Sequence, residues 1–205
     1  MKRTKEDADV TRQQLLESAL RVFSEKGYAA TRLSDIAVAA HVTRGAIYHH
    51  FGSKKELFIA LFKDRSDPHF QIVSEILSSE LPSLEKIRKL VTTMLKNFEE
   101  DELFQADDRL RMRHSSPITD MEEIKAVLGE EIKRTFTMAE KVVQAGQKTG
   151  EIRSDMDAKD IVVFLFALLR GTACILEGGN LKQAIIGKTE IITELFLDGI
   201  RNKKQ

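Results

Sequence analysis

Cysteine, tryptophan and proline are scarce in this sequence, and each scarcity argues against a class of protein. A single cysteine among 205 residues, Cys174, cannot form an intrachain disulfide, which suits a reducing compartment. The chain has no tryptophan and only 6% aromatic residues, which argues against an aromatic-rich β-sheet protein. Only three prolines interrupt the chain, so helices are favoured.

The sequence also lacks a leader-like start, a membrane-length apolar run and a net charge. Its first ten residues are polar and charged, and its longest apolar run, 161–169, is too short to span a bilayer. A cytoplasmic protein without a membrane partner is expected. The zero net charge divides into 12 Lys/Arg against 8 Asp/Glu in residues 1–65, and 20 against 24 in residues 66–205. A basic head on an acidic body permits DNA binding without demanding it.

The hydrophobic pattern is helical almost throughout and predicts an all-α fold of about nine helices. Ser53, with Glu56 three residues later, is a capping box that starts one of them. Three parts are predicted: a flexible charged arm over 1–10, a helix-turn-helix DNA-binding domain over 11–52, and a ligand-binding and dimerisation domain over 53–205. The predicted helices cover 11–27, 33–39, 43–50, 54 to beyond 62, 84–100, 104–114, 120–148, 158–176, and about 182 or 188 to 200.

The segment 33–51 carries the most specific signal in the chain. It predicts two short helices joined by a tight turn near His41, with a small residue, Ala37, where the helices cross. Ile36, Val42 and Ile47 are spaced to fill the gap between the two helices. These three residues, with Ala37 and Phe51, are expected in the core. Such crossing helices let the second one enter the major groove of DNA with its N-terminal residues at the base edges.

Individual residues of this segment suit contact with DNA. Thr43 stands at the N-cap of the second helix, where its hydroxyl and nearby amides can face a phosphate. Arg44 can reach a base edge or a phosphate, and Gly45 permits close approach. Lys54 opens the next helix and can bind a phosphate. The predicted DNA-binding residues are Thr31, Thr43, Arg44, Gly45, Tyr48, His49 and Lys54.

These residues resemble the TetR family of bacterial repressors, and the run from Val42 to Tyr48 looks most like its multidrug-efflux branch, the AcrR-like repressors. The match is strong over about 50 residues. His41 departs from the family pattern, which usually has Gly in the turn. Histidine tolerates a left-handed backbone better than most residues, so the turn is expected to persist with some strain. The matching positions are Thr11, Arg12, Phe23, Gly27, Thr31, 35–37, 42–51 and Lys54.

The C-terminal half predicts a homodimer. The helix 158–176 is apolar nearly all round and must be covered on several sides. In the resembling family the last two helices form a four-helix dimer interface, and a two-fold dimer would read a palindromic operator. The predicted interface residues are Ile161, Leu165, Leu169, Ile191, Leu195 and Phe196.

A small-molecule effector is expected in the helical body, in a site rich in Met and Phe. Such residues most often fill a core, but the resemblance raises the chance that some line a cavity. The acidic run 99–102 would favour a cationic effector, although acidic runs are usually solvated. The predicted effector-binding residues are Met94, Phe98, Met112, His114, Phe136, Phe164 and Leu168.

No pattern in the sequence indicates an enzyme, a cofactor or a metal site. The pair His49–His50 does not form a ligand set, because adjacent residues of a helix do not face one another and no Cys or acidic cluster completes it. The leading hypothesis is a ligand-responsive homodimeric repressor of an efflux or transport operon. The alternatives are an activator or ligand-independent regulator with the same DNA module, and a helical sequestering protein or enzyme without DNA binding.

Overall fold

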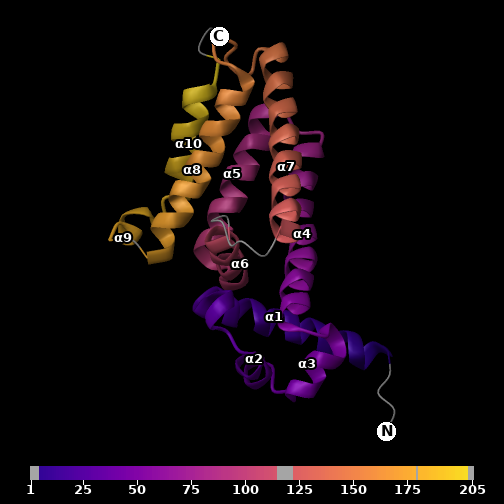
Figure 1. The fold of residues 1–205 in the computed structure, drawn as a ribbon. Helices are drawn as coiled ribbons and strands as arrows, with labels where there is room; N and C mark the ends of the chain where they lie inside the picture. Colours follow the sequence, from indigo (N-terminus) through magenta and orange to yellow (C-terminus); the bar gives the residue numbers. More distant parts are fainter. Residues whose placement is uncertain (1–4, 115–121, 179, 203–205) are drawn as a thin grey trace. The chain divides into compact units, whose positions relative to one another are not determined.

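The computed structural model describes residues 5–114, 122–178 and 180–202, and it is helical in nearly all of them (Figure 1). Gly27 interrupts α1 with a non-helical backbone, so the ten helical elements amount to eleven helices rather than the expected nine. Within this part of the chain the β-structure is an isolated bridge between Ile152 and Arg201. The all-α class is confirmed. The elements are α1 (Lys5–Ala30), α2 (Leu33–Ala39), α3 (Arg44–Phe51), α4 (Lys54–Ser78), α5 (Ser83–Glu100), α6 (Glu102–His114), α7 (Glu122–Thr149), α8 (Ala158–Gly178), α9 (Lys182–Ile185) and α10 (Thr189–Ile200).

The chain divides into two compact units. The first comprises Met1–Pro68 and Glu102–Gly129, and the second comprises His69–Asp101 and Glu130–Gln205. The first unit therefore contains α6 and the start of α7 together with α1, α2, α3 and the start of α4. In addition, α1 begins at Lys5, inside the stretch 1–10 that was expected to be a flexible arm.

The core of the first unit is built on one face of α1. Leu16, Leu20 and Phe23 recur at helical spacing and are at most 1% exposed. The ring of Phe23 packs edge-on against Phe58 of α4 at 4.8 Å between centroids, and Phe62 continues the stack. Truncating one of these rings to alanine typically costs about 3–5 kcal/mol. This core supports α2 and α3.

The second unit contains α5, α8 and α10 packed together with parts of α4 and α7. Along α8 the buried residues form one stripe, which includes Ile161, Leu165 and Leu169. The opposite side exposes Val163 and Phe164. Among the described helices, α8 alone is long and apolar enough to cross a membrane. The core helix of a soluble protein can pass the same test, and 33% of the apolar window of α8 is buried inside the subunit.

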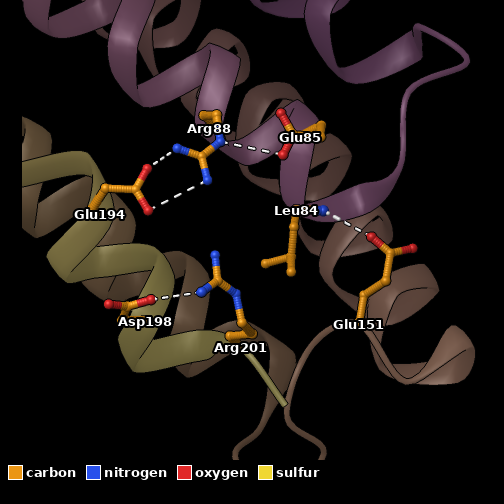
Figure 2. Close-up of polar contacts among 7 residues, drawn as sticks. All are labelled: Leu84, Glu85, Arg88, Glu151, Glu194, Asp198 and Arg201. Carbon is orange, nitrogen blue, oxygen red and sulfur yellow. Dashed lines mark hydrogen bonds and ion pairs between the residues drawn. The ribbon is translucent and has the colours of Figure 1, made fainter. Parts of the chain in front are cut away.

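Polar contacts fix α5 relative to its neighbours in this unit (Figure 2). The guanidinium of Arg88 on α5 binds Glu194 of α10 and also Glu85 on its own helix. The backbone N–H of Leu84 donates to Glu151 at 3.2 Å, which satisfies one of the open donors at the start of α5. The position of α10 on α5 is thus set by an ion pair as well as by apolar packing.

Candidate nucleic-acid interface

The turn between α2 and α3 is closed by His41. Its φ of 53° is left-handed, as expected for a residue in the place of the usual glycine. The N–H of His41 donates to the carbonyl of Val38 at 3.2 Å, and that of Val42 donates to Ala37 at 3.0 Å. This pair of bonds is a Schellman motif, which satisfies the last carbonyls of α2. The chain reverses there within a few residues.

Helix α3 begins directly after this turn, with Thr43 as its N-cap. The side-chain oxygen of Thr43 accepts a hydrogen bond from the N–H of Ala46 at 3.3 Å. Arg44 and Gly45 form the exposed first turn of the helix. The positive end of the helix dipole lies at this turn, so the first turn of α3 suits an anionic phosphate.

The outer face of α3 presents Arg44 and Tyr48 as a pair. One guanidinium nitrogen of Arg44 donates to the Tyr48 hydroxyl at 2.9 Å, and the guanidinium lies 5.4 Å from the ring centroid. Tyr48 is 45% exposed, and His49 beside it is also exposed. A stacked arginine loses less conformational freedom on binding than a free one. The pair is therefore partly ordered before any ligand arrives.

The inner face of the same two helices is apolar and buried. Ile36 and Ala37 of α2 lie against the core together with Ile47 and Phe51 of α3. The burial of these four residues confirms their prediction as core residues, and Val42, predicted with them, is half-buried against the same core. Burial of this face leaves one side of α3 free to meet another molecule.

Two of the predicted DNA-binding residues, Lys54 and Thr31, make contacts within the protein that the sequence did not reveal. The ammonium of Lys54 donates to the carbonyls of Thr31 at 2.7 Å and Ala29 at 3.4 Å, and it lies over the Tyr28 ring. Burial lowers the pKa of this ammonium. Thr31 is 2% exposed, and its hydroxyl donates to the carbonyl of Gly27. Thr31 therefore supports the interface from inside, and phosphate binding by Lys54 stays a prediction.

The residues predicted to bind an effector do not line a common cavity in the described part of the chain. Phe98 is buried, the ring of Phe136 packs against Phe166 at 5.7 Å, and Met94 and Leu168 are half-buried. Phe164 points outward and is 59% exposed. The side chains of Met112 and His114 lie outside the described residues. The second unit has cavities of about 350 and 390 Å³, and those predicted residues whose side chains are described line neither.

The residues predicted for the dimer interface separate into two groups. Ile191 and Leu195 of α10 are exposed and Phe196 is half-buried, whereas Ile161, Leu165 and Leu169 pack inside their own subunit. The contribution of α8 to an apolar surface therefore shifts to Val163 and Phe164. The sequence could not separate the two faces, because α8 is apolar on both.

The acidic run 99–102 has internal partners. A carboxylate oxygen of Glu99 accepts a hydrogen bond from the N–H of Gly187 at 2.6 Å, and Glu102 pairs with Arg21 of α1. These contacts weaken the argument for a cationic effector. In the described ranges no cluster of three or more His, Cys, Asp or Glu side chains could hold a metal ion.

Comparison with known proteins places this geometry in a family. The profile of the bacterial regulatory proteins of the tetR family matches residues 15–61, and that of the C-terminal region of YsiA-like proteins matches 62–199. The HTH-type transcriptional regulator TtgR of Pseudomonas putida is 36% identical over 180 residues, which are 83% of this chain and 82% of that protein. The chain belongs to the TetR family.

Two further proteins resemble this chain over different lengths. The regulator AcrR of Shigella flexneri is 50% identical over 62 residues, 30% of this chain and 29% of that protein. The crystal structure of FadR from Bacillus subtilis in complex with stearoyl-CoA has a TM-score of 0.74 at 22% identity, over 92% of this chain and 99% of that one. This TetR-family chain is a DNA-binding transcriptional regulator and not an enzyme.

Proposed function

We propose that the ligand-free protein is a homodimeric repressor that inserts α3 into the major groove of a palindromic operator. The observation that carries this proposal is the arrangement of α3, whose buried side is anchored by Ile47 and Phe51 and whose free side begins at a capped N-terminus. Arg44, Gly45 and Tyr48 form the surface that meets the DNA.

Each residue of this surface has a separate role. The first turn of α3, capped by Thr43, binds a backbone phosphate through its open N–H groups. Arg44 binds a guanine edge, for which its planar fork is suited. Gly45 keeps the backbone close to the groove floor, and Tyr48 and His49 contact the sugar-phosphate backbone or a thymine methyl group. Phosphate contacts position the helix, and Arg44 supplies sequence preference.

Two copies are needed because one α3 covers only a half-site. The exposed apolar residues of α8 and α10, Val163, Phe164, Ile191 and Leu195, form a surface that a second copy covers. Two-fold symmetry then repeats α3 at least one helical turn of DNA away.

Release follows from binding of a small effector with an apolar part to the helical body. An effector that binds more tightly to a conformation with wrongly spaced α3 helices shifts the population off the operator. The likeness to TtgR and AcrR supports control of an efflux or transport operon by a cytoplasmic regulator.

A gel-shift titration with the DNA upstream of the protein's own gene tests the proposal. The wild-type protein should bind it in preference to random duplex, with an affinity that falls as salt rises. Arg44→Lys should keep nonspecific binding but lose preference for the operator, because lysine cannot bind a guanine edge with a planar fork. Arg21→Lys, on the exposed surface of α1, is the matched control. Equal binding of wild type to operator and random DNA would refute the proposal.

The same DNA module would serve an activator or a ligand-independent regulator. A reporter assay separates these alternatives, because a repressor lowers expression from the bound promoter and an activator raises it. An effector that changes neither expression nor operator affinity would support the ligand-independent alternative.

A further inference from the structure

The second unit contains two neighbouring cavities along α4 and α7. Phe70 of α4 lines the first, of about 350 Å³, and Leu77 of α4 and Ser83 of α5 line the second, of about 390 Å³. Met138 of α7 lines both, so the two cavities adjoin at this side chain, and together they are named the groove. Their volumes lie within the range of small-molecule sites, and the flexible Met138 can adapt to ligands of different shape.

Cationic side chains line both parts of this groove. Lys133 and Arg134 line the first cavity, and Lys86 and Lys141 line the second. Among the described residues that line the two cavities, Glu130 is the one acidic side chain. Residues 66–205 as a whole carry 20 Lys/Arg against 24 Asp/Glu. The positive charge of the groove is therefore a local feature of an acidic region.

None of these four cations pairs with a carboxylate in the part of the chain that the structure describes. Arginines elsewhere in the same unit do: Arg88 binds Glu194 and Arg201 binds Asp198. Arg134 instead lies over the Phe70 ring, with its guanidinium carbon 3.8 Å from the ring centroid. An arginine stacked in this way keeps its outward N–H donors available to an anion.

We infer that this groove binds a free anionic amphiphile, a molecule with an apolar chain and a carboxylate or phosphate group, and that this molecule is the effector. The effector role of this molecule rests on the proposed function, whereas its binding to the groove does not. The apolar chain lies against Met138 and Phe70, and the anionic group binds Lys133 and Arg134. Charged hydrogen bonds in a partly apolar groove are stronger than those between neutral groups.

The positive charge of the groove disfavours cationic and neutral amphiphiles. A cationic amphiphile would place its charge among four side chains of the same sign, which have no carboxylate partner among the described residues. A neutral amphiphile would gain the apolar contacts but no charged hydrogen bond with these side chains, so it should bind more weakly than an anionic one. An anion both neutralises the groove and retains the apolar contacts.

Isothermal titration calorimetry of the full-length protein with dodecanoate and dodecyltrimethylammonium, both below their micellar concentrations, tests the inference. The two probes share a chain length and differ in the sign of the head group. Dodecanoate should bind at least about tenfold more tightly than dodecyltrimethylammonium, a difference of about 1.4 kcal/mol. Equal affinity of the two, or tighter binding of the cation, would overturn the inference.

A pair of double variants locates the site. Lys133→Gln with Arg134→Gln should weaken dodecanoate binding at least about tenfold, because each change removes a charged hydrogen bond. Lys96→Gln with Lys148→Gln removes the same charge from exposed positions on α5 and α7 that line neither cavity, and should leave affinity unchanged. Equal affinity of the two double variants would place binding elsewhere and contradict the inference.

A gel shift with and without dodecanoate then tests the regulatory part. Loss of the operator complex on adding dodecanoate supports the effector role, and persistence of the complex at saturating dodecanoate contradicts it. Failure of the proposed function itself would be visible without dodecanoate, as the absence of any operator complex. The calorimetric result does not depend on that outcome.

Discussion

At Gly45 the fold would accept a larger residue, whereas the proposed function requires glycine. A Cβ added there would lie 3.7 Å from the side-chain oxygen of Thr43, an ordinary contact, so the fold accepts alanine. Glycine inside a helix is less stable than alanine. A glycine at this exposed position is therefore best explained by close approach to another molecule.

Gly45→Ala should leave thermal stability unchanged or raise the free energy of unfolding by up to about 1 kcal/mol. It should also weaken operator binding at least about tenfold, because the methyl group separates α3 from the groove floor. Chemical denaturation and gel shifts measure the two effects. Gly129→Ala on α7, where an added Cβ meets nothing within 4 Å, is the control and should retain wild-type operator affinity. Unimpaired DNA binding by Gly45→Ala would remove the case for close approach.

His41 shows a residue under backbone strain. Its left-handed φ of 53° costs a residue with a Cβ about 1–2 kcal/mol, a penalty that glycine avoids. His41→Gly should therefore raise the free energy of unfolding by about 1 kcal/mol.

Denaturant titration followed by circular dichroism checks the change at His41. Ala39→Gly, two residues earlier in the helical part of α2, is the matched control and should lower stability by up to about 1 kcal/mol. If both glycine variants lower stability equally, the turn is not strained.

At the scale of the element, the start of α2 depends on Asp35. Its carboxylate accepts a hydrogen bond from the backbone N–H of Arg32 at 3.1 Å and pairs with Lys26 of α1 at 3.1 Å. The hydrogen bond from Arg32, followed by that from Lys26, holds the pKa of Asp35 below its ordinary value of 3.8. The bonds fix α2 against α1 and thereby the position of the turn.

This lowered pKa predicts how stability depends on pH. The ionised carboxylate contributes its full stabilisation above the unfolded-state pKa of 3.8, and the contribution disappears as pH falls through the lower pKa of the folded state. The difference in unfolding free energy between wild type and Asp35→Asn should be constant near neutral pH and should shrink below pH 3.8. Denaturation curves at pH 7 and at a series of lower pH values measure it. A difference that stays the same throughout the acid series would contradict this role.

At the scale of the whole molecule, the proposed function requires a second copy to cover the exposed apolar residues of α8 and α10. Leu195 is 71% exposed, and Phe164 and Ile191 are more than half exposed. Water contact with side chains of this size is unfavourable, at roughly 25 cal/mol for each Å² of apolar surface. A second copy removes this cost and also duplicates α3.

Leu195→Glu should therefore convert the dimer to a monomer and abolish tight operator binding while retaining the helical far-ultraviolet spectrum. Analytical ultracentrifugation measures the oligomeric state. Leu81→Glu, at an exposed leucine in the connection between α4 and α5, is the matched control and should remain dimeric. A dimeric Leu195→Glu variant would place the interface elsewhere.

The sequence by itself determined the all-α class and the residues of the helix-turn-helix. Apolar spacing along a helix depends on local geometry, so Ile36, Ile47 and Phe51 could be assigned to the core directly. His41 could be recognised in the turn because a left-handed residue follows from the motif alone.

Tertiary structure decided which apolar or charged residue meets which neighbour. Periodicity does not distinguish the two apolar faces of α8, so only packing shows that Ile161 is buried and Phe164 is exposed. Lys54 meets the carbonyl of Thr31, 23 residues earlier in the chain, and local pattern does not reveal that contact. Three of the groove cations, Lys133, Arg134 and Lys141, lie on α7, and Lys86 joins them only because α5 lies beside α7 at the second cavity. Contacts of this kind depend on the relative placement of elements, which no single segment encodes.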